Sequence, residues 1–344
     1  MGKRIILSGV AAFAVTLGLA AAAQAQDVTL RLHQFLPPQA TIPAKAITPW
    51  IEKVESDSGG RIEIEHYPAM QLGGAPPALF DQARDGVVDI VWTLPGYTPG
   101  RFNKIEAFEL PFMVTTAEAT SKAFYEFVQK NALDEFEDVK LLVAHTHGPG
   151  LLHVRGDGVR SLDDMEGLKL RGPTRVITGM LERLGASAVG MPVPAVPESL
   201  SKGVIDGAVI PWEVTVPLKV PELVDTHTGF SGDHGLYAAT FVMVMNKDSY
   251  EGLPDDLRKV IDDNSGIEAA ALFGRAMDAG DKVGLEKAQA TDNEIVTLNS
   301  GETARWKDAA EPTVANWIEE MDGKGIDGAA LVEDARALIE KHSN

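Results

Sequence analysis

The chain has 344 residues, 44% of them hydrophobic, which is enough for two domains or one large domain with a full core. It contains no cysteine, so disulfides, thiolate nucleophiles and cysteine metal sites are excluded. The formal net charge of −19 argues against nucleic acid and anionic membrane surfaces as partners, because affinity for both depends on clustered lysine and arginine.

The first 25 residues have the pattern of a secretory signal peptide. Lys3 and Arg4 give a positive start, residues 5–23 are apolar, and an Ala-Gln-Ala triplet ends at residue 25. A retained membrane anchor is less favoured, because the strongly apolar core is shorter than the ~20 residues that span a bilayer. We therefore expect residues 1–25 to be removed, which leaves a net charge of −21, and the mature chain to lie in the periplasm.

In the first part of the mature chain, strand and helix patterns alternate. Apolar and polar residues alternate in the strands, and apolar residues recur every three or four positions in the helices. The predicted elements in order are a strand over 28–33, a helix over 42–58, a strand over 61–67, a helix over 78–85 and a strand over 88–92. This order favours an α/β fold with a mainly parallel sheet.

A second unit of the same kind begins after an apolar strand at 141–144. Its predicted elements are a strand over 168–171, a helix over 175–184, a strand over 188–189, a helix over 196–202 and a strand over 208–212. A glycine, two aliphatic residues and an aspartate precede an apolar strand at both 86–89 and 203–206. This repeat indicates two domains built alike.

The remaining chain connects and covers these units. Residues 237–245 form a long apolar strand that we expect to run from one domain back to the other. From residue 257 to the end, alanine-rich and charged residues at helical spacing predict helices. The sequence has no low-complexity linker, so we expect several strands rather than one tether to join the domains.

Arg171 is the strongest candidate for ligand binding. It ends the apolar strand at 168–171, where a buried arginine requires a partner. Its planar guanidinium fits a carboxylate through two hydrogen bonds, and that carboxylate belongs either to a ligand or to a nearby Asp or Glu of the chain. Arg175, at the start of the next helix, is expected at the surface or at the helix cap.

Trp212 and Glu213 interrupt an apolar run at the end of the strand over 208–212. A buried carboxylate is costly without a partner, so Glu213 pairs with a cation, a ligand hydroxyl or a metal, unless it points to solvent. Trp212 either packs in the core or offers its face to a ligand at the domain junction.

Aromatic residues gather where strands end. Ligands of open α/β sheets bind beyond the carboxyl ends of the strands, and rings placed there offer stacking surfaces. Each ring alone is more often part of a core than a ligand contact, but their common placement indicates a cleft. The candidate ligand contacts of this kind are Phe35, Trp92, Tyr97, Tyr237 and Phe241, with His147 beside them.

Signals for catalysis are weak. His145, His147 and His153 fit a metal site in part, yet the spacing fixes no further ligand. A Ser-x-x-Lys match at 199–202 lacks its companion motifs, and no nucleophile elbow, Walker motif or dinucleotide-binding glycine pattern is present. We therefore predict a protein that is not an enzyme and has no catalytic residue, metal or cofactor. A periplasmic hydrolase that uses the histidines is the rival hypothesis.

Several motifs together resemble the solute-binding proteins of tripartite ATP-independent periplasmic (TRAP) transporters, the DctP family. The resemblance covers essentially the whole mature chain. The motifs that carry it are His33–Pro38, Tyr67–Gly74, Asp89–Trp92, Glu109–Phe112, Leu162–Arg171 and Ile205–Gly207.

This resemblance implies a two-domain, type II-like periplasmic-binding-protein fold with hinge strands and a long interdomain helix. We place domain I at 26–152 plus 240–279, and domain II, with the C-terminal helices, at 153–239 plus 280–340. The domains are expected to close over an organic acid. The acid then passes to a pair of membrane permease subunits that an ion gradient drives.

The resemblance also implies roles for single residues. Arg171 falls on the arginine that binds the ligand carboxylate in that family. Trp212 and Glu213 are similar to the pair in members that bind small oxo or hydroxy acids, where a cation bridges ligand and protein. Around 148–153 the chain departs from members that carry a second ligand-facing arginine or polar residue, which disfavours a dicarboxylate or sialic acid.

We therefore expect a monomer that binds an organic monocarboxylate, either an aromatic acid or a short oxo or hydroxy acid. A sugar acid is the alternative ligand. A binding protein that serves an ATP-driven importer or a sensor kinase has the same fold and is a further alternative.

Overall fold

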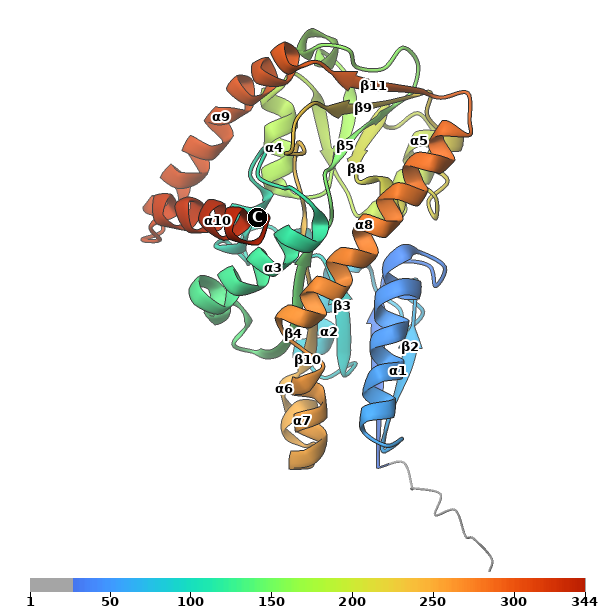
Figure 1. The fold of residues 1–344 in the computed structure, drawn as a ribbon, viewed down its shortest axis with the longest axis vertical. Helices are drawn as coiled ribbons and strands as arrows, with labels where there is room; N and C mark the ends of the chain where they lie inside the picture. Colours follow the sequence, from blue (N-terminus) through green and yellow to red (C-terminus); the bar gives the residue numbers. More distant parts are fainter. Residues whose placement is uncertain (1–26, 344) are drawn as a thin grey trace, which may run out of the picture.

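The computed structural model describes residues 27–343 and contains two β-sheets, one in each half of the molecule along its long axis (Figure 1). Helices pack around both sheets, so the predicted α/β class is confirmed. The predicted signal peptide lies outside the described residues.

The first sheet combines strands from the N-terminal part of the chain with one later strand. Its order is β2 (Ile62–Tyr67), β1 (Val28–Gln34), β3 (Ile90–Thr93), β10 (Thr240–Asn246) and β4 (Val139–Thr146). β1 pairs in parallel with β2 and with β3, whereas β10 is antiparallel to both of its neighbours. β3 and β10 are buried along their whole length, as expected for central strands with continuous apolar runs.

The second sheet holds six strands. Its order is β11 (Glu294–Leu298), β9 (Thr226–Phe230), β5 (Leu151–Val154), β8 (Gly207–Ile210), β6 (Lys169–Gly172) and β7 (Ser187–Gly190). β6 is parallel to β7 and β8, and β9 is parallel to β11, whereas β5 is antiparallel to β8 and β9. Each sheet therefore contains parallel βαβ units and one antiparallel strand between them.

The repeated run at 86–89 and 203–206 occupies equivalent places in the two sheets. Both of its glycines have positive φ angles, 71° and 67°, directly after a helix. The Asp89 carboxylate accepts a hydrogen bond at 2.8 Å from a main-chain N–H beside the neighbouring parallel strand, and Asp206 does the same at 2.9 Å. In both sheets, therefore, the aspartate of this run links the start of its strand to the neighbouring strand by a hydrogen bond.

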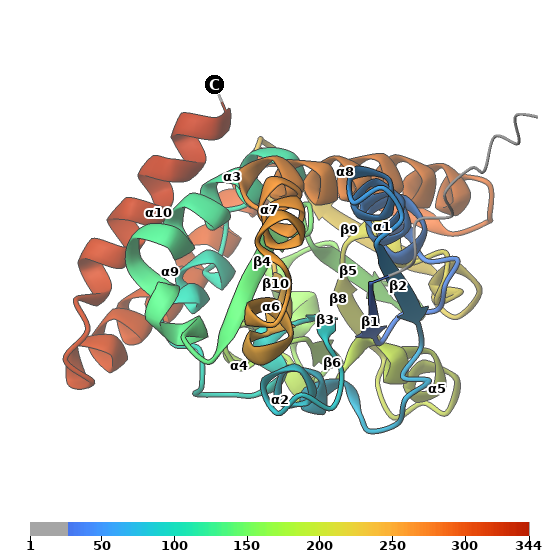
Figure 2. The same ribbon diagram turned by 90° about the horizontal axis from the view of Figure 1, so that it is seen from below.

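Ten α-helices lie within residues 27–343. They are α1 (Thr48–Asp57), α2 (Leu79–Arg84), α3 (Ala117–Phe127), α4 (Arg175–Arg183), α5 (Val196–Ser201), α6 (Lys247–Glu251), α7 (Asp255–Asp263), α8 (Ile267–Gln289), α9 (Ser300–Gly323) and α10 (Gly328–Ser343). Among these described helices, none has the length and apolar character needed to cross a membrane. α9 and α10 form the flank beside α3, on the side away from α1 (Figures 1 and 2).

Three segments connect the two halves. Residues 147–150 join β4 to β5, residues 231–239 join β9 to β10, and α8 runs from the first half to the second (Figure 1). β5 and β10 arrive from the opposite sheet, which explains why both run antiparallel to their neighbours. The predicted boundaries after 152 and 239 fall next to the first two crossings, and α10 packs against α3 of the first half.

α8 contacts both halves through two acids one turn apart. Asp278 accepts hydrogen bonds from the first two main-chain N–H groups of α3, at 2.7 and 3.0 Å. Asp281 accepts one from the main-chain N–H of Glu213 at 2.8 Å. Gly148 lies so close to Asp281 that any side chain there would collide with the carboxylate. The helix therefore positions α3, the first crossing and the segment after β8 together.

Some predicted elements differ from the structure. The strand expected over 208–212 ends before Pro211, which lacks an N–H for the sheet, and Trp212–Val214 form a short 3-10 helix. The strand expected over 237–245 begins only at residue 240. The helical pattern from 257 onward is interrupted by β11. The sequence patterns also do not indicate β5, β9 or α3.

Candidate functional site

A cavity lies between the two sheets. Its walls come from the carboxyl ends of β1, β3, β4, β6 and β8 and from the residues that lead into β10. This is where α/β folds bind ligands. The predicted site residues that line it are Phe35, Trp92, Tyr97, His147, Arg171, Glu213, Tyr237 and Phe241.

Sequence reasoning missed the aliphatic part of this lining. Every missed residue lies in a strand or within four positions of a strand end, often beside a predicted one. That position, rather than residue type, is the signal that could have located them. They are Leu36, Leu94, Pro173, Val193, Ile210, Pro211, Val214 and Ala239.

Arg171 is 2% exposed at the end of β6. Its Nε donates to the carbonyl oxygen of Met191 at 2.8 Å and its Nη1 to that of Val209 at 3.3 Å, whereas Nη2 has no partner. Burial lowers the pKa of the guanidinium from its ordinary value. Within residues 27–343 no carboxylate forms an ion pair with it, so the structure places an unpaired, charged donor at the cavity.

Three rings form one stacked wall of the cavity. Trp92 lies between Phe35, with centroids 4.9 Å apart and planes at 21°, and Phe241, at 5.0 Å and 2°. The indole Nε1 donates to Nε2 of His145 at 2.8 Å, which fixes the plane of the stack. Burial lowers the pKa of His145 to about 3, so this imidazole is neutral and accepts the bond. The wall suits contact with another aromatic ring.

Two tyrosines lie near the guanidinium of Arg171. Burial raises the pKa of both Tyr97 and Tyr237, and the positive charge of Arg171 acts against that rise. The Tyr97 hydroxyl accepts a hydrogen bond from the main-chain N–H of Val193 at 3.0 Å, which joins the two halves. Gly150 lies against the ring of Tyr237, and a Cβ there would collide with the ring carbons.

His147 faces the cavity, yet both of its ring nitrogens bond to the main chain. Nε2 accepts a hydrogen bond from the N–H of Ala239 at 2.9 Å, so the proton resides on Nδ1, which donates to the Gly148 carbonyl oxygen at 2.5 Å. Burial lowers the pKa of His147 to about 4, with a smaller effect from Arg171. The neutral imidazole joins the two crossing segments 147–150 and 231–239.

Glu213 is 5% exposed, directly after β8. Its main-chain N–H donates to Asp281, and its carbonyl oxygen accepts a hydrogen bond from Thr41 Oγ1 of the first half at 3.2 Å. Its Oε2 has no partner. Burial, followed by the neighbouring Asp281, raises the pKa of Glu213 to about 8, so the carboxyl group is largely protonated at neutral pH.

Trp212 does not line the cavity. Its ring packs against His153 and His227, with centroids 5.1 and 4.8 Å apart. Its main chain lies against Gly284 of α8, where a Cβ would collide with it. Trp212 therefore lies in the packing between the second sheet and α8.

The histidines considered as metal ligands are engaged with protein groups. His145 is bonded to Trp92, and His153 Nδ1 lies 2.6 Å from His227 Nδ1, with its Nε2 3.2 Å from the carbonyl oxygen of Ile210. No cluster of three or more His, Cys, Asp or Glu suited to a metal ion occurs in the described part of the chain. The structure lends no support to a metal site here.

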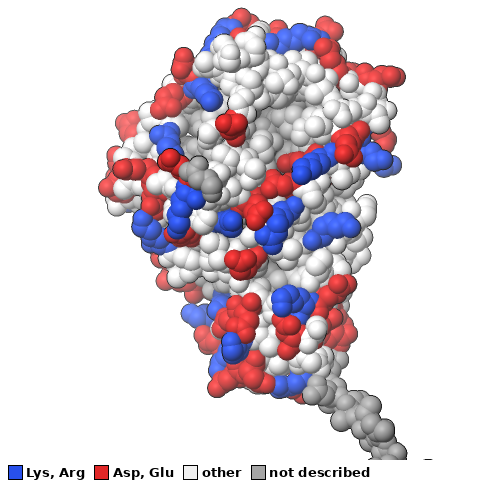
Figure 3. All heavy atoms as spheres, in the orientation of Figure 1, with Lys and Arg blue, Asp and Glu red and all other residues white. Residues whose placement is uncertain are grey.

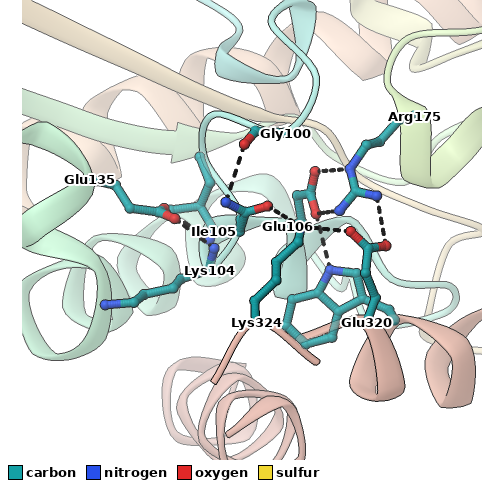
Figure 4. Close-up of polar contacts among 10 residues, drawn as sticks. Gly100, Lys104, Ile105, Glu106, Glu135, Arg175, Glu320 and Lys324 are labelled. Atoms are coloured by element: carbon teal, nitrogen blue, oxygen red, sulfur yellow. Dashed lines mark hydrogen bonds and ion pairs between the residues drawn. The ribbon is translucent and has the colours of Figure 1, made fainter. Parts of the chain in front are cut away.

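An ion-pair cluster around the buried Glu106 joins the two halves (Figure 4). Arg175 at the start of α4 donates from Nε to Glu106 at 2.6 Å and from Nη1 to Glu320 of α9 at 2.8 Å. Glu106 belongs to the short 3-10 helix Ile105–Glu109 of the first half, and it also accepts a hydrogen bond from Trp317 Nε1 at 3.1 Å. Arg175, expected at the surface or at the helix cap, begins α4 with a side chain 29% exposed, and its ion pair with Glu106 crosses between the halves.

Charged side chains of both signs are interspersed over the face shown in Figure 3. The chain as a whole is acidic, with a net charge of −19, and the guanidinium of Arg171 is hidden beneath this surface. An anionic ligand therefore meets an unpaired positive charge inside the cavity, although the chain as a whole is acidic.

A larger groove between α3 and α10 is open to solvent. Its lining mixes charges of both signs, among them Lys122, Glu118, Asp233 and Arg336. The stacked rings and the unpaired guanidinium belong to the smaller cavity. We therefore place the candidate site in that cavity.

The sequence matches the profile of the family described as bacterial extracellular solute-binding protein, family 7 (DctP) over residues 33–320. That span includes all the lining residues of the cavity and every strand of both sheets except the first five residues of β1.

Solved structures of TRAP solute-binding proteins share the fold. A protein from Rhodoferax ferrireducens, in complex with copurified benzoate, is 51% identical over 92% of this chain and 98% of its own, with a TM-score of 0.90. A marine metagenome protein described as specific for aromatic acid ligands, with 3-hydroxybenzoate, is 49% identical over 93% of this chain and 100% of its own, with a TM-score of 0.91. A Bordetella bronchiseptica protein with bound mandelate is 30% identical over 91% and 99%, with a TM-score of 0.84.

Proposed function

Because the chain belongs to the DctP family of TRAP transporter solute-binding proteins, we propose that it captures an aromatic monocarboxylate in the periplasm for uptake. The observation that carries this proposal is the buried Arg171, whose Nη2 lacks a partner in a cavity lined by rings. A ligand carboxylate supplies the missing negative charge. The family consists of non-catalytic binding proteins, so the hydrolase alternative is set aside.

An aromatic acid matches the lining better than a sugar acid does. A sugar acid carries several hydroxyl groups, and each needs a hydrogen-bond partner once it is buried. The hydroxyl of Tyr97 and both ring nitrogens of His147 already bond to the main chain. The two relatives near 50% identity bind benzoate and 3-hydroxybenzoate, which supports the same class of ligand here.

We assign the ligand contacts by their place in the cavity. Arg171 binds the carboxylate, the stacked wall contacts the ring, and Tyr97, Tyr237, His147 and Glu213 complete the enclosure. Trp212 acts indirectly, through the position of the 3-10 helix that carries Glu213.

The two halves then act as the domains that close over the acid, with hinges at 147–150, 231–239 and α8. A ligand that touches both halves stabilises the closed form by its greater affinity for that form. The closed, loaded protein delivers its ligand to the membrane permease subunits of the transporter.

Thermal unfolding with a panel of acids tests this proposal. The panel contains benzoate, 3-hydroxybenzoate, lactate and D-glucuronate, and the proteins are the wild type and Arg171→Ala. Ligand at 100 times its dissociation constant adds ~2.7 kcal/mol of stability, which gives a clear shift. We expect a shift with the aromatic acids that is lost in Arg171→Ala.

Arg160→Ala is the matched control, because Arg160 is an exposed arginine far from the cavity in an ion pair with Glu294. It should keep the full ligand-induced shift. A larger shift with glucuronate than with every aromatic acid, or an equal shift in Arg171→Ala, would contradict the proposal.

A further inference from the structure

Glu213 is a second unmatched polar group in the cavity. Among the described buried side-chain atoms without a hydrogen-bond partner, only Arg171 Nη2 and Glu213 Oε2 belong to residues that line it. An unpaired buried polar atom is destabilising and is normally satisfied by protein, water or ligand. Arg171 is satisfied by a carboxylate, and that leaves Glu213.

The surroundings of Glu213 favour the neutral, protonated form of its carboxyl group. Among residues 27–343 no Lys, Arg or His side chain forms an ion pair with it, and its nearest charged neighbour is Asp281. Burial and this neighbour raise its pKa to about 8. A protonated carboxyl group both donates and accepts a hydrogen bond, as a phenolic hydroxyl does.

Apart from Arg171, the other polar side chains of the lining are engaged with the protein, except that of Tyr237, which lies near the Arg171 guanidinium at the carboxylate end of the ligand. Both nitrogens of His147 and the hydroxyl of Tyr97 are bonded to main-chain groups. The residues next to Glu213 in the lining, Pro211 and Val214, are apolar. A ligand atom that reaches Oε2 therefore has Glu213 as its hydrogen-bonding partner.

We propose that Glu213 binds a hydroxyl group on the ring of the ligand, so that the preferred ligands are hydroxylated aromatic monocarboxylates. This inference rests on the proposed function, because it takes the carboxylate to be held by Arg171. An unsubstituted ring leaves Oε2 buried and unpaired, and a site built around a hydrogen bond discriminates against a ligand that cannot make it.

Isothermal titration with benzoate and with 2-, 3- and 4-hydroxybenzoate tests the inference. In the wild type, the best hydroxybenzoate should bind at least tenfold more tightly than benzoate. Glu213→Leu keeps roughly the size of the side chain and removes its hydrogen bonding, so the ratio of hydroxybenzoate affinity to benzoate affinity should fall to about one. Glu213→Gln, which donates and accepts, should retain most of the preference.

Glu109→Gln is the matched control for loss of a buried acid. Glu109 is 1% exposed, has an unpaired Oε2 and a pKa raised by burial to about 7, but it does not line the cavity. Glu109→Gln should leave the ratio of hydroxybenzoate affinity to benzoate affinity unchanged. If Glu109→Gln lowered that ratio as much as Glu213→Leu, the assignment to Glu213 would be overturned.

The remaining outcomes separate this inference from the proposed function. Benzoate binding as tight as that of all three isomers in the wild type overturns the inference and leaves the proposed function intact. Loss of hydroxybenzoate binding when sodium is replaced by choline also overturns the inference and leaves the proposed function intact. That result would mean that Glu213 Oε2 binds a cation rather than a ligand hydroxyl. Failure of every aromatic acid to bind the wild type overturns both. The wild-type series decides the question even if a variant fails to fold.

Discussion

His147 accepts a hydrogen bond from the main-chain N–H of Ala239 through its Nε2, at 2.9 Å. The two residues lie on different crossing segments, so this bond, like that from the Gly150 N–H to the Tyr237 carbonyl oxygen at 2.9 Å, joins the connection from β4 to β5 with the connection from β9 to β10. The same imidazole donates from Nδ1 to Gly148 within its own segment. A ring that was expected to contact ligand therefore also organises the hinge.

Replacing His147 with Phe should destabilise the protein by about 1–3 kcal/mol. Phe keeps a ring but leaves the buried N–H of Ala239 without an acceptor, and such a group costs about that much. Urea unfolding of the ligand-free protein measures the change. His234→Phe, on an exposed histidine of the second crossing segment, should change stability by less than about 0.5 kcal/mol. Equal losses in the two variants would contradict the role of His147.

Replacing Arg171 with Leu should abolish binding of the acid without loss of fold stability. The guanidinium is buried and has no anionic partner, so an apolar side chain removes an uncompensated charge. We expect the free energy of unfolding of the ligand-free protein to stay equal or to rise by about 1–3 kcal/mol. Urea unfolding after removal of bound ligand tests this. A loss of 2 kcal/mol or more would show that Arg171 is structural.

Replacing Arg175, unlike replacing Arg171, should lower the stability of the fold. Its partner Glu106 is buried, with a side chain 7% exposed, and Arg175→Met leaves that carboxylate without its ion pair. Breaking a buried pair costs about 3 kcal/mol. The double variant Arg175→Met/Glu106→Gln should recover part of the loss, which a double-mutant cycle of unfolding free energies measures.

A surface ion pair beside this cluster provides the control. Lys324 bonds Glu320 at 2.7 Å, with both side chains 38% exposed. Lys324→Met should therefore cost no more than about 0.5–1 kcal/mol. If Lys324→Met lowered the free energy of unfolding as much as Arg175→Met, the burial of Glu106 would not determine how much stability its ion pair contributes.

Glu109 should make stability fall as pH rises. Burial raises its pKa in the folded protein to about 7, above the ordinary 4.5, so the folded state holds the proton between pH 4.5 and 7 while the unfolded state has lost it. Its contribution is complete below pH 4.5 and is lost as pH rises through 7. Glu109→Gln should reduce the difference in unfolding free energy between pH 5 and pH 8 by about 2 kcal/mol. Parallel pH profiles of the two proteins would refute this.

A methyl group at position 150 should impair binding. In Gly150→Ala the added Cβ collides with the ring of Tyr237 and pushes it toward the ligand space, so affinity for benzoate should fall at least tenfold. Gly179→Ala is the control, because a Cβ there has no neighbour within 4 Å and alanine favours the helix by about 0.5–1 kcal/mol. Titration calorimetry should find its benzoate affinity unchanged.

The local signals in the sequence were sufficient for most strands and for the place of Arg171. A charged residue at the end of an apolar strand is recognisable from a short stretch of sequence. The ends of the strands in an α/β fold lie close together, so such a residue can be assigned to the ligand site. For the same reason the rings after β1 and β3 could be assigned to one cleft. Residue 212 shows the limit of this reasoning, since one position past Pro211 the chain turns into a 3-10 helix and Trp212 packs on α8 instead.

Contacts between distant segments could not be predicted. His147 meets Ala239 and Arg175 meets Glu106 only after the crossing segments pair and the halves close. β5 and β9 are short strands whose pairing with each other follows from the crossings rather than from any alternation of their own. The protonation of Glu213 likewise depends on Asp281, which lies 68 positions further along the chain.

The burial of the cavity lining bears on how quickly a bound acid can leave the protein. Phe35, Trp92, Arg171, Glu213 and Tyr237 are each no more than 5% exposed, so an acid bound among them is largely shielded from water. Under the proposed function, such an acid leaves only when the two halves separate, and acids of different affinity differ in how long they hold the halves together.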